Sequence, residues 1–407
     1  MLDDLRVLEI SAPETMLAGR ILADLGADVI VVEPPAGARG RRLAPFLDDV
    51  PGIERSLTWH ALNYNKRGIT LGVCSPDGRA LMRDLATRCD VVIEAAGAGG
   101  ASPLDSIELS PRVIRCTIAP FVRGGPKNQY ASTDFTVMAA SGAPAMTGDL
   151  DRPPLFFPVP QAMMEAGADA AIAVLAGLIA RDRDALGQRI DVSARIAAMM
   201  ASFGQAIVPG SGNPEGKRSQ GAMTIAGVQV PSVYQCADGF MLITIGFGPV
   251  FGQMTQRLAK WAAEEGHVDP RIAELSWPAF ISDLSARKAS PSDLQALVDG
   301  LKSLTRSKTK SVLAENSRRL GLLASPVMNM QDVAGYEQYR ERGLFAQVYL
   351  EQGREIDVPA RFAQFSNYSI EIKRPAPRLS EHSAEIFEAE LGLSRTEIQA
   401  LFVAGEI

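Results

Sequence analysis

The sequence predicts an α/β fold with a doubly wound, parallel sheet in its N-terminal part. Three apolar runs, at residues 5–10, 27–33 and 90–94, read as buried strands. Two stretches between strands, residues 15–26 and 79–88, read as helices. Strands that alternate with helices are typical of βαβ units, in which helices cover a parallel sheet.

The remaining elements follow in order along the chain. Residues 67–73 and 113–118 read as two further strands. Four prolines between positions 153 and 160 enforce an extended segment, and residues 161–181 then form a helix whose alanines and glycines suit close packing. Residues 233–245 read as a hairpin that turns at Asp238-Gly239, and this hairpin belongs to a second, smaller domain.

The composition excludes several classes of protein. The 407 residues are 46% hydrophobic and 22% charged, as in ordinary globular chains, and the formal net charge is −6. This charge balance gives no reason to expect nucleic acid as a partner. The four cysteines form no CxxC pair and only three histidines are present, so we expect no metal site.

We expect a cytoplasmic protein that has no contact with a membrane. The first residues, MLDDLRVLEIS, lack the basic start and apolar centre of a signal peptide. The longest strongly apolar stretch, residues 170–180, is too short to cross a bilayer. Scattered single thiols suit a reducing compartment.

The segment after the first strand lacks the motif of a nicotinamide or nucleoside-triphosphate site. Residues 11–14 (SAPE) contain no glycine cluster. A basic loop, AGARGRR, follows the second strand instead. Since the carboxyl ends of parallel strands face the ligand crevice, Arg39, Arg41 and Arg42 in this loop either meet phosphate groups or are simply solvated.

No histidine reads as a catalytic base. No Ser-His-Asp or Cys-His set occurs at an informative spacing. His60 follows Trp59 in an apolar neighbourhood, which is typical of a packed or surface histidine. His382, in the segment SEHSAE, is expected at a helix cap or in a first helical turn.

Seven segments occur in an order that is specific for one protein family, although no single segment is specific by itself. They are LRVLEIS, LADLGADVIVVEPP, NYNKRGITLGV, CDVVIEAAGAG, TDFTVMAASGAPAMTG, YQCADGFMLITI and APRLSEHSAEIFEAELGLSRTEI. This ordered set resembles the class III CoA-transferases, the family of formyl-CoA transferase and carnitine CoA-transferase. The resemblance covers almost the whole chain.

The resemblance implies a fold and a domain division. A Rossmann-like large domain is built from both chain ends, residues 1–205 and 331–407. Residues 206–227 are expected to be a linker and residues 228–330 an inserted, smaller α+β domain. The resemblance also implies that two chains thread through each other as interlocked rings.

The resemblance further implies a reaction. In the family, CoA moves from an acyl-CoA to a carboxylic acid, without a metal or a nicotinamide. An aspartate carboxylate attacks the thioester to form a mixed anhydride, and the released CoA thiolate then forms an aspartyl-CoA thioester that the acceptor acid attacks. Residues matched to the family's CoA contacts are Arg39, Arg41, Leu71 and Ala95.

This chain departs from the family at the nucleophile. The family aspartate lies four residues before a glycine that here is Gly167, and Met163 occupies the matching position. A thioether cannot form the anhydride. Glu165 is the nearest carboxylate, but two residues turn a helical side chain by about 200°, so Glu165 is expected to face away from the pocket.

Three further segments depart from the family. Residues 12–14 (APE) and 95–97 (AAG) replace polar CoA-contacting residues of active relatives, and residues 226–229 (AGVQ) stand where formyl-CoA transferase has a glycine run. We therefore expect a non-catalytic subunit of a hetero-oligomeric CoA-transferase, as in the two-gene benzylsuccinate CoA-transferase. Its partner is a paralogous catalytic chain, or a second copy of itself in the interlocked dimer.

Two alternatives stay open. The first is a homodimeric CoA-transferase or other acyl-CoA enzyme that uses another carboxylate, Glu165 or Asp169. The second is a protein without enzymatic activity that binds acyl-CoA.

Overall fold

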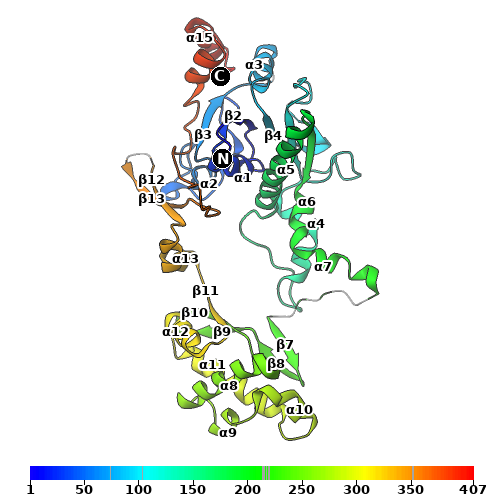
Figure 1. Ribbon diagram of the computed structural model, residues 1–407, viewed down its shortest axis with the longest axis vertical. Coiled ribbons are helices and arrows are strands. Elements are labelled where there is room, and N and C mark those ends of the chain that lie inside the picture. Colours follow the sequence, from blue (N-terminus) through cyan, green and yellow to red (C-terminus); the bar gives the residue numbers. More distant parts are fainter. Residues whose placement is uncertain (74, 103, 213–215, 217, 219–220, 351–352) are drawn as a thin grey trace. The chain divides into compact units, whose positions relative to one another are not determined.

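The computed structural model describes residues 1–73, 75–102, 104–212, 216, 218, 221–350 and 353–407, and these form two compact units (Figure 1). The large unit comprises Met1–Ala145, Phe156–Glu215 and Glu337–Ile407, and the small unit comprises Met146–Leu155 and Gly216–Tyr336. Part of the expected linker, residues 206–227, is strand rather than linker, because β7 (Ala222–Ile225) lies within it.

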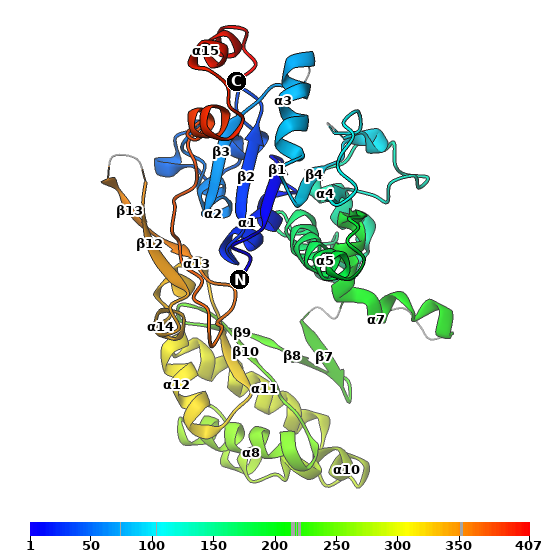
Figure 2. The same cartoon turned by 45° about the horizontal axis from the view of Figure 1, so that its top comes forward.

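The central sheet of the large unit has six strands in the order β3-β2-β1-β4-β5-β6, and neighbouring strands in it pair in parallel. Figure 2 shows β1, β2 and β3 lying side by side. The strands are β1 (Arg6–Ile10), β2 (Asp28–Glu33), β3 (Lys66–Thr70), β4 (Val91–Ala95), β5 (Ile114–Ala119) and β6 (Arg189–Ser193). The prediction of an α/β fold with a parallel central sheet is confirmed.

The large unit also contains helices and a two-stranded ribbon. The helices are α1 (Met16–Asp24), α2 (Leu57–Leu62), α3 (Pro76–Ala86), α4 (Asp134–Ser141), α5 (Ala162–Asp184), α6 (Ala194–Met199), α7 (Phe203–Ala206), α14 (Glu337–Glu341) and α15 (Arg395–Val403). The ribbon pairs β12 (Phe345–Tyr349) with β13 (Glu355–Pro359) in antiparallel fashion.

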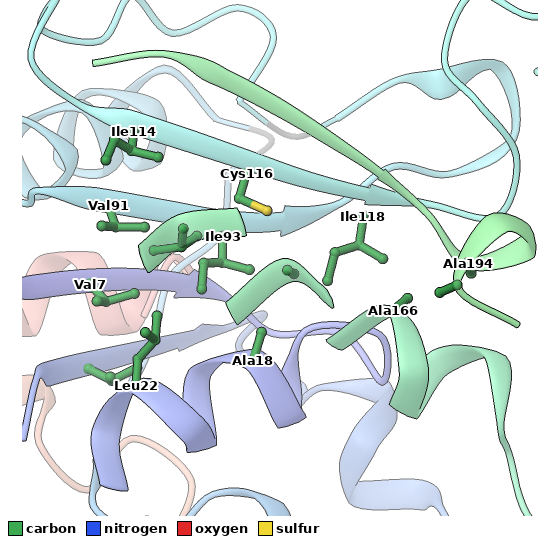
Figure 3. Close-up of a cluster of buried hydrophobic side chains, with 14 of the residues drawn as sticks. Val7, Ala18, Leu22, Val91, Ile93, Ile114, Cys116, Ile118, Ala166 and Ala194 are labelled. Carbon is green, nitrogen blue, oxygen red and sulfur yellow. The ribbon is translucent and has the colours of Figure 1, made fainter. Parts of the chain in front are cut away.

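Apolar side chains cover both faces of the sheet. On one face, residues of α1 and α5 pack against the strands, and Figure 3 shows Ala18, Leu22 and Ala166 in this cluster. On the other face, Met82 of α3 and Phe387 of a π-helical turn, η9 (Glu385–Glu390), join Leu8, Ile30 and Val92. Such coverage explains why these strands are apolar along their whole length.

Helix α5 packs closely because its inner side chains are small. A Cβ atom at Gly167 would lie 3.0 Å from the Cβ of Leu17, so α1 and α5 approach each other where glycine stands. With 23 residues, α5 is longer than the apolar stretch 170–180, and by length and composition alone it is long and apolar enough to cross a membrane. Core helices of soluble proteins meet the same criteria of length and composition, and Ala170 and Val174 of α5 are buried in the core.

The small unit joins antiparallel strands to a group of helices. The expected hairpin is present as β9 (Val233–Cys236) and β10 (Gly239–Ile243), to which β11 (Ala324–Val327) is added, and β7 pairs with β8 (Val228–Pro231). The helices are α8 (Gly248–Glu264), α9 (Pro270–Ala273), α10 (Phe280–Ser285), α11 (Pro291–Arg306), α12 (Lys310–Leu320) and α13 (Met330–Gly335). Trp277 and Phe280 stack in its core.

His382 gives the large unit a pH-dependent contribution to stability. Its Nδ1 accepts a hydrogen bond from the Gly68 N–H at 3.1 Å, and its own backbone N–H donates to the Gly68 carbonyl. Burial lowers the pKa of His382 below 6.5, so the folded state favours the neutral ring. This stabilisation is fully present above the unfolded pKa of about 6.5 and is lost as pH falls.

We predict that His382→Asn makes the stability of the large unit less dependent on pH between 7.5 and 5. The wild type loses up to about 1.4 kcal/mol per pH unit through this one group. Denaturation at several pH values measures the slope, and NMR titration of the histidine rings measures the pKa directly. Since the chain has three histidines, the variant identifies the His382 signal by its loss. A ring pKa at or above 6.5 would contradict the prediction.

Candidate functional site

A cavity of about 430 Å³ lies in the large unit at the carboxyl ends of β1, β4 and β5. Ala12 follows β1, Ala95 ends β4, and Pro120 follows β5, so three neighbouring strands supply one wall. The N-terminal residues of α4 and α5 supply another wall. Ligands of open α/β sheets bind in this position, because the strand ends and helix N-termini converge there.

Met163 lines this cavity, and Glu165 is absent from its lining. The two residues lie two positions apart on α5, which accounts for their opposite directions. One carboxylate oxygen of Glu165 is buried without a hydrogen-bond partner. Burial, and then the carboxylates of Asp134 and Asp169, raise the pKa of Glu165 above its usual value. Asp169 lines a different hollow.

Asp134 joins the two helices at the cavity wall. It is the first residue of α4, whose N-terminus is closed by hydrogen bonds between Thr133 and Thr136. The Asp134 carboxylate accepts the N–H groups of Gln161 at 3.0 Å and of Met163 at 2.9 Å. It therefore satisfies two of the free N–H groups at the start of α5. Sequence reasoning missed this role, since only the tertiary structure brings positions 134 and 163 together.

Glu14 is a second carboxylate in the cavity lining that sequence reasoning did not single out. It belongs to the segment between β1 and α1, and one of its carboxylate oxygens is buried without a hydrogen-bond partner. A buried acceptor without a donor is costly, by about 1–3 kcal/mol or more for a charged group. Glu14 is thus the carboxylate of the lining that has a free acceptor atom.

The structure separates the arginines of the basic loop. The Arg39 side chain is exposed, lines the cavity and makes no hydrogen bond or ion pair with another described residue. Arg41 is 0% exposed, and its guanidinium pairs with Glu33 at 2.7 and 2.8 Å, donates to the Pro377 carbonyl and lies 4.0 Å over the Trp59 ring. The expectation that Arg41 binds the nucleotide is therefore wrong, because its donors are already used inside the core.

Leu71 does not line the cavity. Its side chain is 2% exposed and packs with Met82 and Ile407, and its N–H donates to the Glu33 carbonyl at 2.8 Å. The expectation that the Leu71 side chain contacts CoA is therefore wrong, because this side chain packs in the core. Ala95 lies in the cavity lining, where a ligand contact was expected.

Lys66 and Arg67, the first two residues of β3, also have internal partners. The Lys66 ammonium pairs with Glu9 at 2.7 Å with both side chains fully buried, and Arg67 pairs with Asp28 and Glu390. Among the residues that the structure describes, no group of three or more His, Cys, Asp or Glu side chains is placed to hold a metal ion. The expected absence of a metal stays a prediction.

Comparison with known proteins identifies the family. The family model described as CoA-transferase family III matches residues 2–383, and the chain belongs to this family. A solved CAIB/BAIF family protein from Brucella suis has a TM-score of 0.78 and 30% identity, over 96% of this chain and 99% of that one.

Two curated relatives cover nearly the whole chain. Succinyl-CoA:(R)-benzylsuccinate CoA-transferase subunit BbsE from Thauera aromatica is 29% identical over 99% of this chain and 97% of its own length. Succinate–glutarate CoA-transferase from Agrobacterium fabrum is 28% identical, over 93% of this chain and 92% of its own. The chain is thus of the class of CoA-transferases that use an acyl-CoA as substrate.

Proposed function

We propose that this chain is the non-catalytic subunit of a hetero-oligomeric class III CoA-transferase, which moves CoA between an acyl-CoA such as succinyl-CoA and a carboxylic acid. The observation that carries the proposal is Met163 in the cavity lining. A carboxylate is needed there to accept the acyl group as an anhydride, and a thioether offers no such oxygen. The paralogous chain of the complex supplies that carboxylate.

Three features support this assignment. Glu165, the nearest acid on α5, is absent from the cavity lining. Two relatives named above act with succinyl-CoA or succinate, and one of them is named as a subunit. Arg39 gives the cavity a cation for an anionic substrate.

The assembly and the location are proposals of the same kind. We propose that the large domain is built from both chain ends around an inserted small domain, and that two chains interlock as rings. In the proposed complex one of the two is the nucleophile-bearing paralogue. A cytoplasmic location stays a prediction.

Co-expression tests the proposal. The chain is produced alone and together with a family III chain of the same genome that has aspartate at the position of Met163. We expect a stable complex that transfers CoA, and no transfer by this chain alone. With succinyl-CoA, hydroxylamine and mass spectrometry should locate the acyl adduct on the paralogue. A homodimer that transfers CoA by itself would refute the proposal.

A specific observation favours one second candidate, a homodimeric enzyme that uses another carboxylate. Glu14, rather than Glu165 or Asp169, lines the cavity with a buried, unpartnered oxygen. In this case Glu14 attacks the thioester carbonyl, the carbon–sulfur bond breaks, and CoA leaves as the thiolate. A hydroxylamine-sensitive adduct on Glu14 in the chain alone would decide for this candidate. Binding of CoA without any adduct in either preparation would leave the non-enzymatic acyl-CoA-binding protein.

A further inference from the structure

A second hollow in the large unit, of about 360 Å³, carries polar groups that lack partners. Its walls come from α5 and β6 and from the residues after β5. Ser193 is 7% exposed, and its hydroxyl has no hydrogen-bond partner. Ser193 precedes the first residue of α6, but its hydroxyl does not cap that helix. The Asp169 carboxylate makes no hydrogen bond or ion pair with another described residue. The hollow thus presents two acceptors to whatever enters it.

The charges of the hollow favour a cation as the missing donor. Arg123 is its one positive residue, and its contacts with Asp105 and Asp191 are already made, each at 3.5 Å. Asp169 is therefore uncompensated, and Asp191, which shares Arg123, is the second carboxylate of the lining. Burial raises the pKa of Asp169 above its usual value, as is expected for an acid that lacks a counter-ion. An incoming ammonium or guanidinium would supply both the charge and the hydrogen-bond donors.

The surroundings of the hollow favour a protein side chain over a free amine. Ile172 and Ile179 of α5 are 66% and 59% exposed, and Ile196 and Met200 are also exposed. A small amine would leave these apolar side chains in water, whereas a protein surface would cover them. Carboxylates on the same helix face argue against an anionic lipid surface.

The spacing on α5 favours a helix as the docking element. Glu165, Asp169, Ile172, Ala176 and Ile179 follow each other at intervals of four, three, four and three residues. Residues at these intervals share one face of a helix, and this is the spacing by which two helices pack along each other. The inner face of α5 is buried against the sheet, so this stripe is its outer face.

We propose that the hollow formed by α5 and β6 is a socket for a lysine or arginine side chain, carried on a helix of the second class III CoA-transferase chain. The cation reaches Asp169 and Ser193, and the apolar residues around it cover Ile172 and Ile179. This inference rests on the proposed partner-dependent function and adds the surface through which the partner is recognised.

Substitutions on α5 test the socket. This chain is co-expressed with the nucleophile-bearing chain, and the yield of the purified complex is measured, because interlocked chains assemble as they fold. Asp169→Lys should lower this yield at least tenfold, because the new ammonium fills the socket and repels the incoming cation. Asp169→Asn should lower it less, since an acceptor remains. Asp84→Lys is the matched control and should change the yield less than threefold, because Asp84 is an exposed carboxylate on α3, which packs on the face of the sheet opposite to α5.

The outcomes separate the socket from the proposed function. If Asp169→Lys gives the complex in wild-type yield and circular dichroism shows it folded, the socket is wrong while co-assembly stands. If Asp169→Lys instead prevents a homodimer of this chain from forming, the occupant of the socket is a second copy of this chain and not a paralogue. If the wild type neither binds the second chain nor needs it for transfer, both the proposed function and the socket fail.

Discussion

Substitution of Met163 by aspartate should give the chain an acyl adduct that the wild type does not form. Removing the nucleophile of a serine protease costs about six orders of magnitude in turnover, so restoring part of a missing one is expected to have a large effect. We expect hydroxylamine-sensitive acylation of Met163→Asp by succinyl-CoA at a rate on the order of 10³-fold above the background that the wild type sets in the assay. Mass spectrometry of the trapped protein should locate the modification at position 163.

The geometry around position 163 supports this expectation. Met163 already lines the cavity, and Asp134 holds its backbone N–H at 2.9 Å, so the new carboxylate would enter on a fixed helix start. Met163→Asn is the matched control and should form no adduct, because asparagine has the shape of aspartate but lacks the carboxylate that accepts the acyl group. Acylation of Met163→Asp at Glu14 instead of position 163 would show that the family register at this site is misread.

Replacement of Lys66 by alanine should destabilise the large unit by about 3–5 kcal/mol. Lys66 and Glu9 are both fully buried, 2.7 Å apart, and the ammonium also donates to the Asn63 side chain and the Met16 carbonyl. Removing one partner of such a pair leaves the other charge buried and uncompensated. Hydrogen exchange of the β1 and β3 amides reports the loss, since both strands lie in the core of this unit.

The loss caused by Lys66→Ala should grow with pH. Burial raises the pKa of Glu9 above 4.5 in the folded chain, and removing the ammonium removes a favourable interaction with the ionised form. The folded variant thus holds a proton that the unfolded chain releases, so its stability falls as pH rises above about 4.5. Lys127→Ala, at an exposed position, should change stability by less than about 0.5 kcal/mol. Equal losses of stability in Lys66→Ala and Lys127→Ala would contradict a stabilising role for the buried ion pair.

The sheet could be predicted from the sequence because its strands are buried on both faces. Where strands and helices alternate along the chain, a short apolar run such as that of β2 predicts a strand that is covered on both faces. The orientation of Glu165 relative to Met163 also followed from helix geometry alone. These features depend on neighbouring residues, which is the information that a pattern carries.

The partners of charged residues could not be predicted, because they depend on tertiary contacts. Arg39 and Arg41 stand two positions apart in one basic loop, yet Arg39 faces the cavity and Arg41 is inside the core with Glu33. Glu14 and Asp134 reach the cavity from segments 120 residues apart in the sequence. No local pattern distinguishes a carboxylate that caps a distant helix from one that is solvated.

The bond from Asp134 to α5 has a consequence for how such chains diverge. The Asp134 carboxylate accepts a hydrogen bond from the backbone N–H of residue 163, and this bond does not depend on which side chain stands there. The residue at this point can therefore be exchanged in evolution without any repair of the surrounding architecture. After gene duplication, one copy can lose its reactive group in a single step and still fold, which is how an enzyme with two identical halves can become one with two specialised halves.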